Sequence, residues 1–173
     1  AVGDHLMLGG DNMDLALARH LEKKISGPLD AHQFKALTAA ARDSKERILL
    51  ENAPDKMSVA VMGRGSSVIG GSVKTELLQQ EARAILLEGF FPQSKVDENP
   101  ITTGRSGIRE WGLPYVHDPA VTRHLSQFLR YHALADNAGN PVIRDGKLAI
   151  PRPEAVLFNG GAMKPAAFRH RIQ

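Results

Sequence analysis

Apolar residues recur at helical spacing soon after the start of the chain. Met13, Leu17 and Leu21 stand four residues apart, which places them on one face of a helix. Asp11 has the residue type of an N-cap, and Asp14 follows it at the position of the acidic half of a capping box. We therefore expect a helix that begins at Asp11 and ends at the Ser-Gly-Pro stretch that follows Ile25.

A second helix is predicted between Asp30, a suitable N-cap, and about residue 52. Its apolar stripe has the spacing of one buried helix face. That stripe comprises Phe34, Leu37, Ala41, Ser44 and Ile48. The adjoining face carries Arg42, Lys45 and Leu49, with Glu46 beside them.

Alternation with a period of two follows the second helix. Residues 57–63 predict a strand with Met57, Val59 and Val61 on one side. A Gly-Arg-Gly turn and a returning strand over residues 66–71 complete the predicted hairpin. A third helix is expected over about residues 74–90. Its inward-facing residues are Leu77, Leu78, Ala82, Ile85 and Leu86.

No hydrophobic period is sustained over residues 92–117, although Trp111 and Tyr115 indicate that part of this stretch packs against the rest. Asp118-Pro119 has the pattern of an N-cap followed by an N1 proline, and it predicts a fourth helix. That helix carries Val121, Leu125, Phe128, Leu129 and His132.

The last third of the chain has two further signals. Asp145-Gly146 is the preferred type I′ dipeptide and predicts a hairpin. Residues 155–158 predict a strand, followed by Gly160-Gly161 and by a helix after Pro165. Helices and hairpins thus follow one another without regular β-α alternation, which favours an α+β fold with helices packed on a small antiparallel sheet.

Composition narrows the classes of protein. The chain has 173 residues, of which 42% are hydrophobic, enough for a core. It has no cysteine, so disulfides and thiolate metal sites are excluded, and a cytoplasmic location is the default. No stretch is apolar enough to predict a membrane span. The 22 basic residues are spread among 19 acidic ones, which indicates a solvated surface and no nucleic-acid partner.

Two glycine pairs remain as candidate sites, because the chain has no Walker, Rossmann, zinc-protease or nucleophile-elbow motif. Gly160-Gly161 has three interpretations: a phosphate cradle, an elbow that lets a base approach the backbone, or close packing of a strand on a helix. No lysine-serine pair follows, which disfavours the cradle. Gly9-Gly10 precedes a helix, but Asp11 and Asp14 would repel an anion there.

Three segments together resemble DnaK-type, seventy-kilodalton heat-shock chaperones. "GDHLMLGGDNMDLALARHL" is similar to the pattern G-D-x-x-L-G-G-[ED]-D-[FM]-D, with one extra residue before Leu8. "AARDSKERIL" resembles the A-x-[ED]-x-A-K-x-x-L-S helix, and "VLFNGGAMKP" resembles V-L-V-G-G-S-[ST]-R-I-P. The resemblance covers most of the chain, and residues 92–118 and 139–151 are then insertions.

The resemblance implies an actin-like ATPase fold, of which residues 1–173 would be a single domain cut from a larger one. They would form the small upper subdomain of the second lobe with flanking strands of the larger subdomain. This subdomain covers the adenosine of ATP or ADP, whereas magnesium is bound only in the full-length parent. The parent would then be an ATPase, but the fragment alone would not. Its partners would be an adenine nucleotide and a co-chaperone or client protein.

The resemblance also assigns cofactor-binding positions residue by residue. Glycines and one lysine match the family pattern directly: Gly9, Gly10, Lys45, Gly160 and Gly161. Arg42 stands for an acid that binds the ribose, Glu46 for an arginine that stacks on the base, and Leu49 for a serine that reaches the adenine. In the elbow, Ala162 stands for a serine and Lys164 for an arginine.

These exchanges predict a remodelled or weakened adenosine site. A lysine ammonium stacks poorly on a base, and a leucine has no hydrogen-bond donor. The chain is therefore either a nucleotide-binding subdomain or a protein-interaction module that keeps the fold with a degraded site. In the second case Trp111, Tyr115 and the Asp145-Gly146 hairpin would be the contacts. An unrelated small α+β enzyme has no catalytic constellation to support it.

Overall fold

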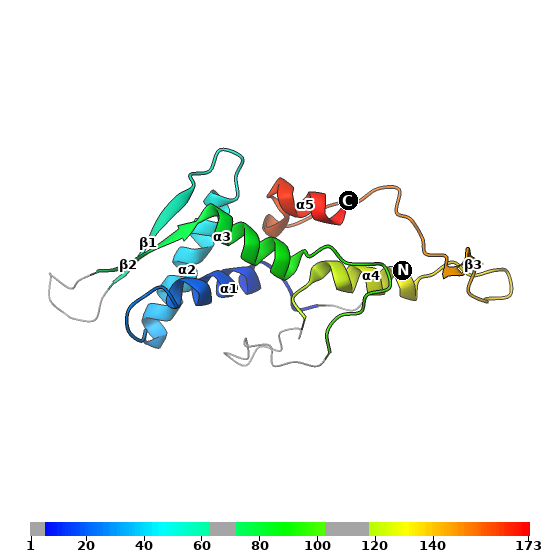
Figure 1. Cartoon of the computed structure of the whole chain (residues 1–173), viewed down its shortest axis with the longest axis horizontal. Helices are drawn as coiled ribbons and strands as arrows, with labels where there is room; N and C mark the ends of the chain where they lie inside the picture. The colour runs from blue at the N-terminus through cyan, green and yellow to red at the C-terminus, as the bar shows by residue number, and fades with distance from the viewer. Residues whose placement is uncertain (1–5, 63–71, 103–117) are drawn as a thin grey trace. The chain divides into compact units, whose positions relative to one another are not determined.

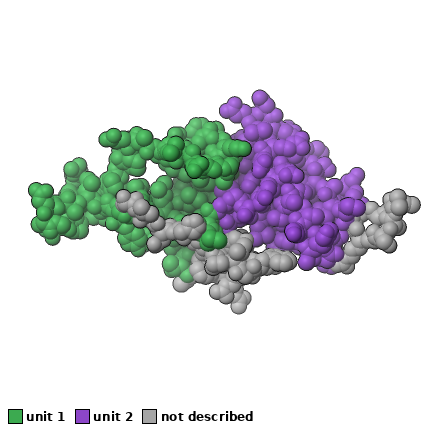
Figure 2. All heavy atoms as spheres, turned by 180° about the vertical axis from the view of Figure 1, so that it is seen from behind, with its two compact units in different colours: residues 1–8, 90–173 green, residues 9–89 purple. Residues whose placement is uncertain are grey.

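The computed structural model describes residues 6–62, 72–102 and 118–173. The chain divides into two compact units, one of residues 9–89 and one of residues 1–8 and 90–173 (Figure 2). Helices and short antiparallel strands follow one another in mixed order, which confirms the predicted α+β class. That the chain is one piece of a larger domain, with insertions at 92–118 and 139–151, stays a prediction.

The unit of residues 9–89 packs two helices and a hairpin together (Figure 1). Its elements are α1 (Gly10–Glu22), α2 (Ala31–Ile48), β1 (Lys56–Met62), β2 (Ser72–Leu78), α3 (Gln79–Arg83) and the π-helical turn η1 (Ala84–Glu88). Strands β1 and β2 pair antiparallel, with Val59 opposite Thr75 and Val61 opposite Val73. Contacts of α1 with α2, and of α2 with β1, build the core of this unit.

Helix α2 follows its sequence pattern closely. Asp30 is the N-cap, because its carboxylate accepts a hydrogen bond from Gln33 N at 2.8 Å, and the Gln33 side chain accepts one from Asp30 N. All five residues of the predicted stripe are buried: Phe34, Leu37, Ala41, Ser44 and Ile48. The helix ends four residues earlier than predicted, because residues 50–53 form a turn that leads into β1.

The start of α1 corrects the sequence-based prediction. The N-cap is Gly9 and not Asp11, and the helix begins at Gly10. The side chain of Asn12 accepts a hydrogen bond from Gly9 N at 2.9 Å and thus supplies the reciprocal cap expected of Asp14. Asp14 is instead buried, at 1% exposure. Met13, Leu17 and Leu21 are buried as predicted.

The third helix was predicted to begin too early. Residues 72–78 form strand β2, and the helix starts only at Gln79. Thr75 and Leu77 are buried and alternate with exposed residues, so the segment has the period of a strand packed on one face. Val59 and Val61 on β1 are buried as predicted. The returning strand expected over residues 66–71 lies outside the described residues.

The other unit contains α4 (Val121–Tyr131), β3 (Ile143–Arg144), β4 (Lys147–Leu148), the 3-10 turn η2 (Gly161–Met163) and α5 (Ala166–Ile172). Phe91 and Phe168 are buried and stack with ring centroids 4.7 Å apart. The helix expected after Pro165 is confirmed as α5. Trp111 and Tyr115 lie outside the described residues.

Two further predictions in this unit have opposite outcomes. The type I′ turn between β3 and β4 is confirmed by positive φ angles at both Asp145 (50°) and Gly146 (72°). The strand expected over residues 155–158 is absent from the described structure, where Val156 is 47% and Leu157 94% exposed. An apolar segment forms a strand only beside a partner strand, and the described residues supply none here.

Candidate functional site

The residues predicted to bind a nucleotide are divided between the two units. The α1–α2 half lies in the unit of residues 9–89 and contains Gly9, Gly10, Arg42, Lys45, Glu46 and Leu49. The elbow half lies in the other unit and contains Gly160, Gly161, Ala162 and Lys164.

In the α1–α2 half, two cations of α2 hold the first turns of α1. Lys45 Nζ lies 2.5 Å from Asp14 Oδ1 and 3.2 Å from the carbonyl oxygen of Gly10. Arg42 Nε donates to Asp14 Oδ2 at 2.7 Å, and its guanidinium also pairs with Asp11. Asp14 thus receives one cation on each carboxylate oxygen. Burial of an ionised carboxylate requires such pairing.

These contacts determine which of the predicted site residues have side chains accessible to a ligand. Lys45 is buried against Asp14, and Leu49 lies in the core at 6% exposure. Arg42 and Glu46 are exposed on the adjoining turns of α2. The hydrogen bond that Arg42 donates to Asp14, together with the charges of Asp14 and Asp11, raises the pKa of Arg42 above its usual value. The surface of this half therefore offers one guanidinium and one carboxylate to a polar ligand.

Gly9 has an extended backbone, with φ of −162°, that any residue adopts. A Cβ atom added at Gly9 would meet nothing within 4 Å. Close packing against the described part of the chain therefore does not explain this glycine.

The elbow half is built on a glycine conformation. Gly160 has φ 89° and ψ 157°, a region that side-chain-bearing residues rarely adopt. A Cβ at Gly160 or Gly161 would meet nothing within 4 Å, so close packing does not explain the pair within the described residues. Ala162 is half-buried and Lys164 is exposed. The backbone around Gly160 is thus open to an approaching group.

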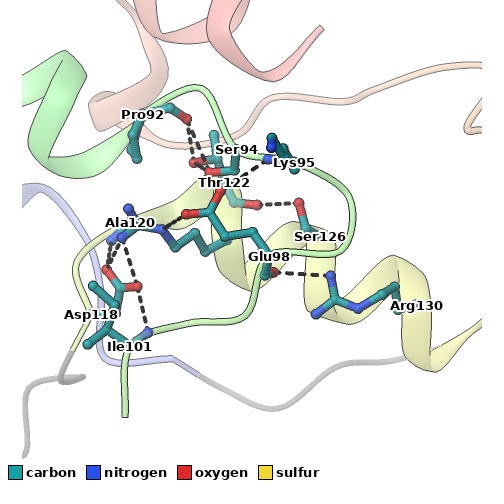
Figure 3. Close-up of polar contacts among 11 residues, drawn as sticks. Pro92, Ser94, Lys95, Glu98, Ile101, Asp118, Ala120, Thr122, Ser126 and Arg130 are labelled. Carbon is teal, nitrogen blue, oxygen red and sulfur yellow. Dashed lines mark hydrogen bonds and ion pairs between the residues drawn. The ribbon is translucent and has the colours of Figure 1, made fainter. Parts of the chain in front are cut away.

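A second polar cluster, which the sequence did not predict as a unit, centres on Asp118 (Figure 3). Asp118 is 2% exposed and accepts hydrogen bonds from Ile101 N and Ala120 N, both at 2.9 Å. Arg123 Nη1 lies 3.1 Å from Asp118 Oδ2, and Arg123 Nε lies 2.7 Å from Glu98 Oε1. The Asp-Pro signal correctly marked the approach to a helix, but α4 begins at Val121 and Asp118 serves the preceding loop.

The contacts of Asp118 indicate that this cluster stabilises the fold. Burial alone would raise the pKa of Asp118, but the N–H groups of Ile101 and Ala120 and the guanidinium of Arg123 outweigh it and lower that pKa. Thr122, on α4, also holds the preceding segment, because its hydroxyl donates to the Pro92 carbonyl at 2.8 Å. A carboxylate held ionised in this way ties the loop before α4 to the helix and is unsuited to proton transfer at neutral pH.

Metal ligation and membrane insertion have no support in the described ranges. Within residues 6–62, 72–102 and 118–173, no group of three or more histidine or acidic side chains is placed to hold a metal ion. Among the helices of the same ranges, none is both long enough and apolar enough to cross a membrane.

Comparison with known proteins identifies no relative. No protein-family model matches the chain. Neither a curated protein nor a solved structure is significantly similar to it.

Proposed function

We propose that this chain is the adenosine-side nucleotide-binding subdomain of a divergent DnaK-type chaperone with an actin-like ATPase fold. The observation that carries the proposal is the contact between Lys45 Nζ and the carbonyl oxygen of Gly10, at 3.2 Å. These residues belong to two separate segments of the resemblance, 35 positions apart, and they meet at the start of α1.

The exposed side chains define how an adenine nucleotide would bind. The Glu46 carboxylate can accept hydrogen bonds from ribose hydroxyls, and the Arg42 guanidinium can donate to ribose or stack on the base. In the other unit, taken by itself, Gly160 and Gly161 leave their backbone open to a flat ring. Leu49 and Lys45 are occupied inside the unit, so the affinity for ATP and ADP is expected to be weak. Magnesium and hydrolysis belong to the full-length parent.

Calorimetric titration of the full-length protein and of this chain with ATP, ADP and GTP tests the proposal. ATP and ADP should bind, and GTP should bind more weakly. Glu46→Ala should lower the affinity for ADP, whereas Glu51→Ala, which removes another exposed carboxylate outside the predicted site, should leave it unchanged. Absence of ATP and ADP binding by the full-length protein would overturn the proposal.

A second function, a protein-interaction module, is favoured by a different observation. Arg42 and Lys45 are engaged in ion pairs with Asp14, which leaves fewer groups for a nucleotide. In the other unit, the β3–β4 hairpin exposes apolar side chains, with Ile143 at 59% and Leu148 at 37%. Exposed apolar residues on a hairpin are suited to contact a co-chaperone or client protein.

The double substitution Ile143→Ser with Leu148→Ser separates this function from the first. If the chain is an interaction module, this change should abolish capture of a purified co-chaperone or client in a pull-down while circular dichroism stays unchanged. Capture that persists in the variant removes the basis for this function.

A further inference from the structure

Asn159 stands directly before Gly160 at the elbow, and this is the one Asn-Gly dipeptide in the sequence. Asn99 and Asn140 precede proline, which has no backbone N–H. Asn52 and Asn137 precede alanine and Asn12 precedes methionine, and in each case the side chain of the following residue crowds its peptide nitrogen. The chain therefore contains one asparagine that is followed by a residue with a backbone N–H and no side chain.

The geometry at Asn159 brings its side chain onto that nitrogen. Gly160 N lies 2.8 Å from Asn159 Oδ1, so the amide carbonyl is folded back over the next peptide unit. Both residues are exposed, and they lie outside any helix or strand. The hydrogen atom of Gly160 N thus points to the neighbouring side chain and is not held by a helix or sheet carbonyl.

We propose that Asn159 is a site of spontaneous deamidation. Hydroxide removes the proton of Gly160 N, and the nitrogen attacks Asn159 Cγ. A bond forms between Gly160 N and Cγ, the bond from Cγ to Nδ2 breaks, and Nδ2 leaves as ammonia with a proton from water. The five-membered succinimide then adds water at either of its carbonyls. The products are aspartate, with the ordinary backbone, and isoaspartate, with one extra backbone atom.

Either product changes the elbow chemically. A carboxylate appears beside Gly160, where the described structure places an uncharged amide. Isoaspartate also lengthens the backbone immediately before the positive φ of Gly160. A consequence that rests on the proposed function is that the added charge and the altered backbone disturb the approach of the adenine ring to the elbow and lower the affinity for the nucleotide.

The test is peptide mapping by mass spectrometry of the wild-type protein after incubation at neutral and at mildly alkaline pH. The peptide with Asn159 should gain about 1 Da, and part of it should react with an isoaspartyl methyltransferase. The rate should rise roughly tenfold per pH unit, as expected for attack by a deprotonated amide. The peptide with Asn137 and Asn140 is the internal control and should change severalfold more slowly.

An unchanged mass at Asn159, or a rate no higher than that at Asn137, overturns the proposal. Asn159→Gln should slow the modification strongly, because the longer side chain must close a six-membered ring, which forms much more slowly than the five-membered one. Titration of fresh and incubated protein with ADP then separates the two proposals. If fresh protein binds no ADP, the proposed function fails while the modification stands. If both samples bind ADP equally, the consequence for the nucleotide site is wrong.

Discussion

Lys45 and Asp14 form a buried ion pair, with 2.5 Å between Lys45 Nζ and Asp14 Oδ1 and with 9% and 1% of their side chains exposed. The pair joins α2 to α1 across 31 positions of the sequence (45 minus 14). A carboxylate this deeply buried depends on its cations, because an unpaired charge in the interior is strongly destabilising. The lysine at position 45 therefore has a structural explanation that does not require a nucleotide.

Lys45→Met should lower the free energy of unfolding by about 3 kcal/mol, because Asp14 keeps only Arg42 as a cation. Lys56→Met is the matched control, since Lys56 and Glu76 pair at the surface with 62% and 52% of their side chains exposed. That change should cost less than about 1 kcal/mol. Urea unfolding of both variants measures the difference, and equal losses would mean that Asp14 does not depend on Lys45.

Glu81 contributes stability that depends on pH. Hydrogen bonds from Lys24, from Leu78 N and from His20 lower the pKa of Glu81 from 4.5 to about 2, against an opposing effect of burial. Because the folded-state pKa is depressed, this stability is fully present above pH 4.5 and is lost as the pH falls toward about 2. Glu81→Gln should therefore cost about 1–2 kcal/mol at neutral pH.

The difference between wild type and Glu81→Gln in urea unfolding should shrink between pH 4.5 and about 2. The exposed Glu76, whose side chain is 52% accessible, provides the control Glu76→Gln, for which the difference should stay small at every pH. A Glu81→Gln difference that is constant down to about pH 2 would contradict the assigned cause.

The features that the sequence predicted correctly depend on residues that lie close together in the sequence. The Asp30 cap, the buried stripe of α2 and the type I′ turn at Asp145-Gly146 each follow from a local pattern. The role of Asp14 does not, because its partners Arg42 and Lys45 stand on another helix. The capping-box spacing suggested a local role, and the tertiary contact replaced it.

The wrong strand and helix assignments have a common cause. Residues 72–78 alternate in burial only because β1 lies opposite them, and their leucines also fit a helical period. Residues 155–158 have the composition of a strand but no partner strand among the described residues. Strand formation depends on pairing, which a single segment does not specify. The positive φ of Gly160, in contrast, agrees with the glycine that the sequence singled out.

Gly160 and Gly161 should differ in their tolerance of a side chain. Gly160→Ala forces a methyl group onto a residue at φ 89° and should cost about 1–3 kcal/mol, although the surrounding space is open. Gly161→Ala is the matched control, because Gly161 has no positive φ and its Cβ would also meet nothing within 4 Å. Hydrogen exchange of residues 160–173 measures the loss of protection in both variants. Equal protection in the two variants would show that alanine does not strain the backbone at position 160.

Asp118→Ala should destabilise the attachment of the loop before α4. The substitution leaves Ile101 N and Ala120 N without an acceptor, and Arg123 keeps only Glu98. The expected loss is about 2–4 kcal/mol. Asp97→Ala is the control, since Asp97 is an exposed aspartate of the same loop and its change should stay within about 0.5 kcal/mol.

Hydrogen exchange at Ile101 and Ala120, followed against pH, distinguishes a structural from a merely electrostatic role of Asp118. The lowered pKa of Asp118 means that wild-type protection at these amides should persist at neutral pH and decline only below the usual range of an aspartate. Asp118→Asn keeps one acceptor oxygen but loses the charge facing Arg123, so it should retain part of the protection and lose its pH dependence. Full protection in Asp118→Ala would contradict the assignment of these hydrogen bonds.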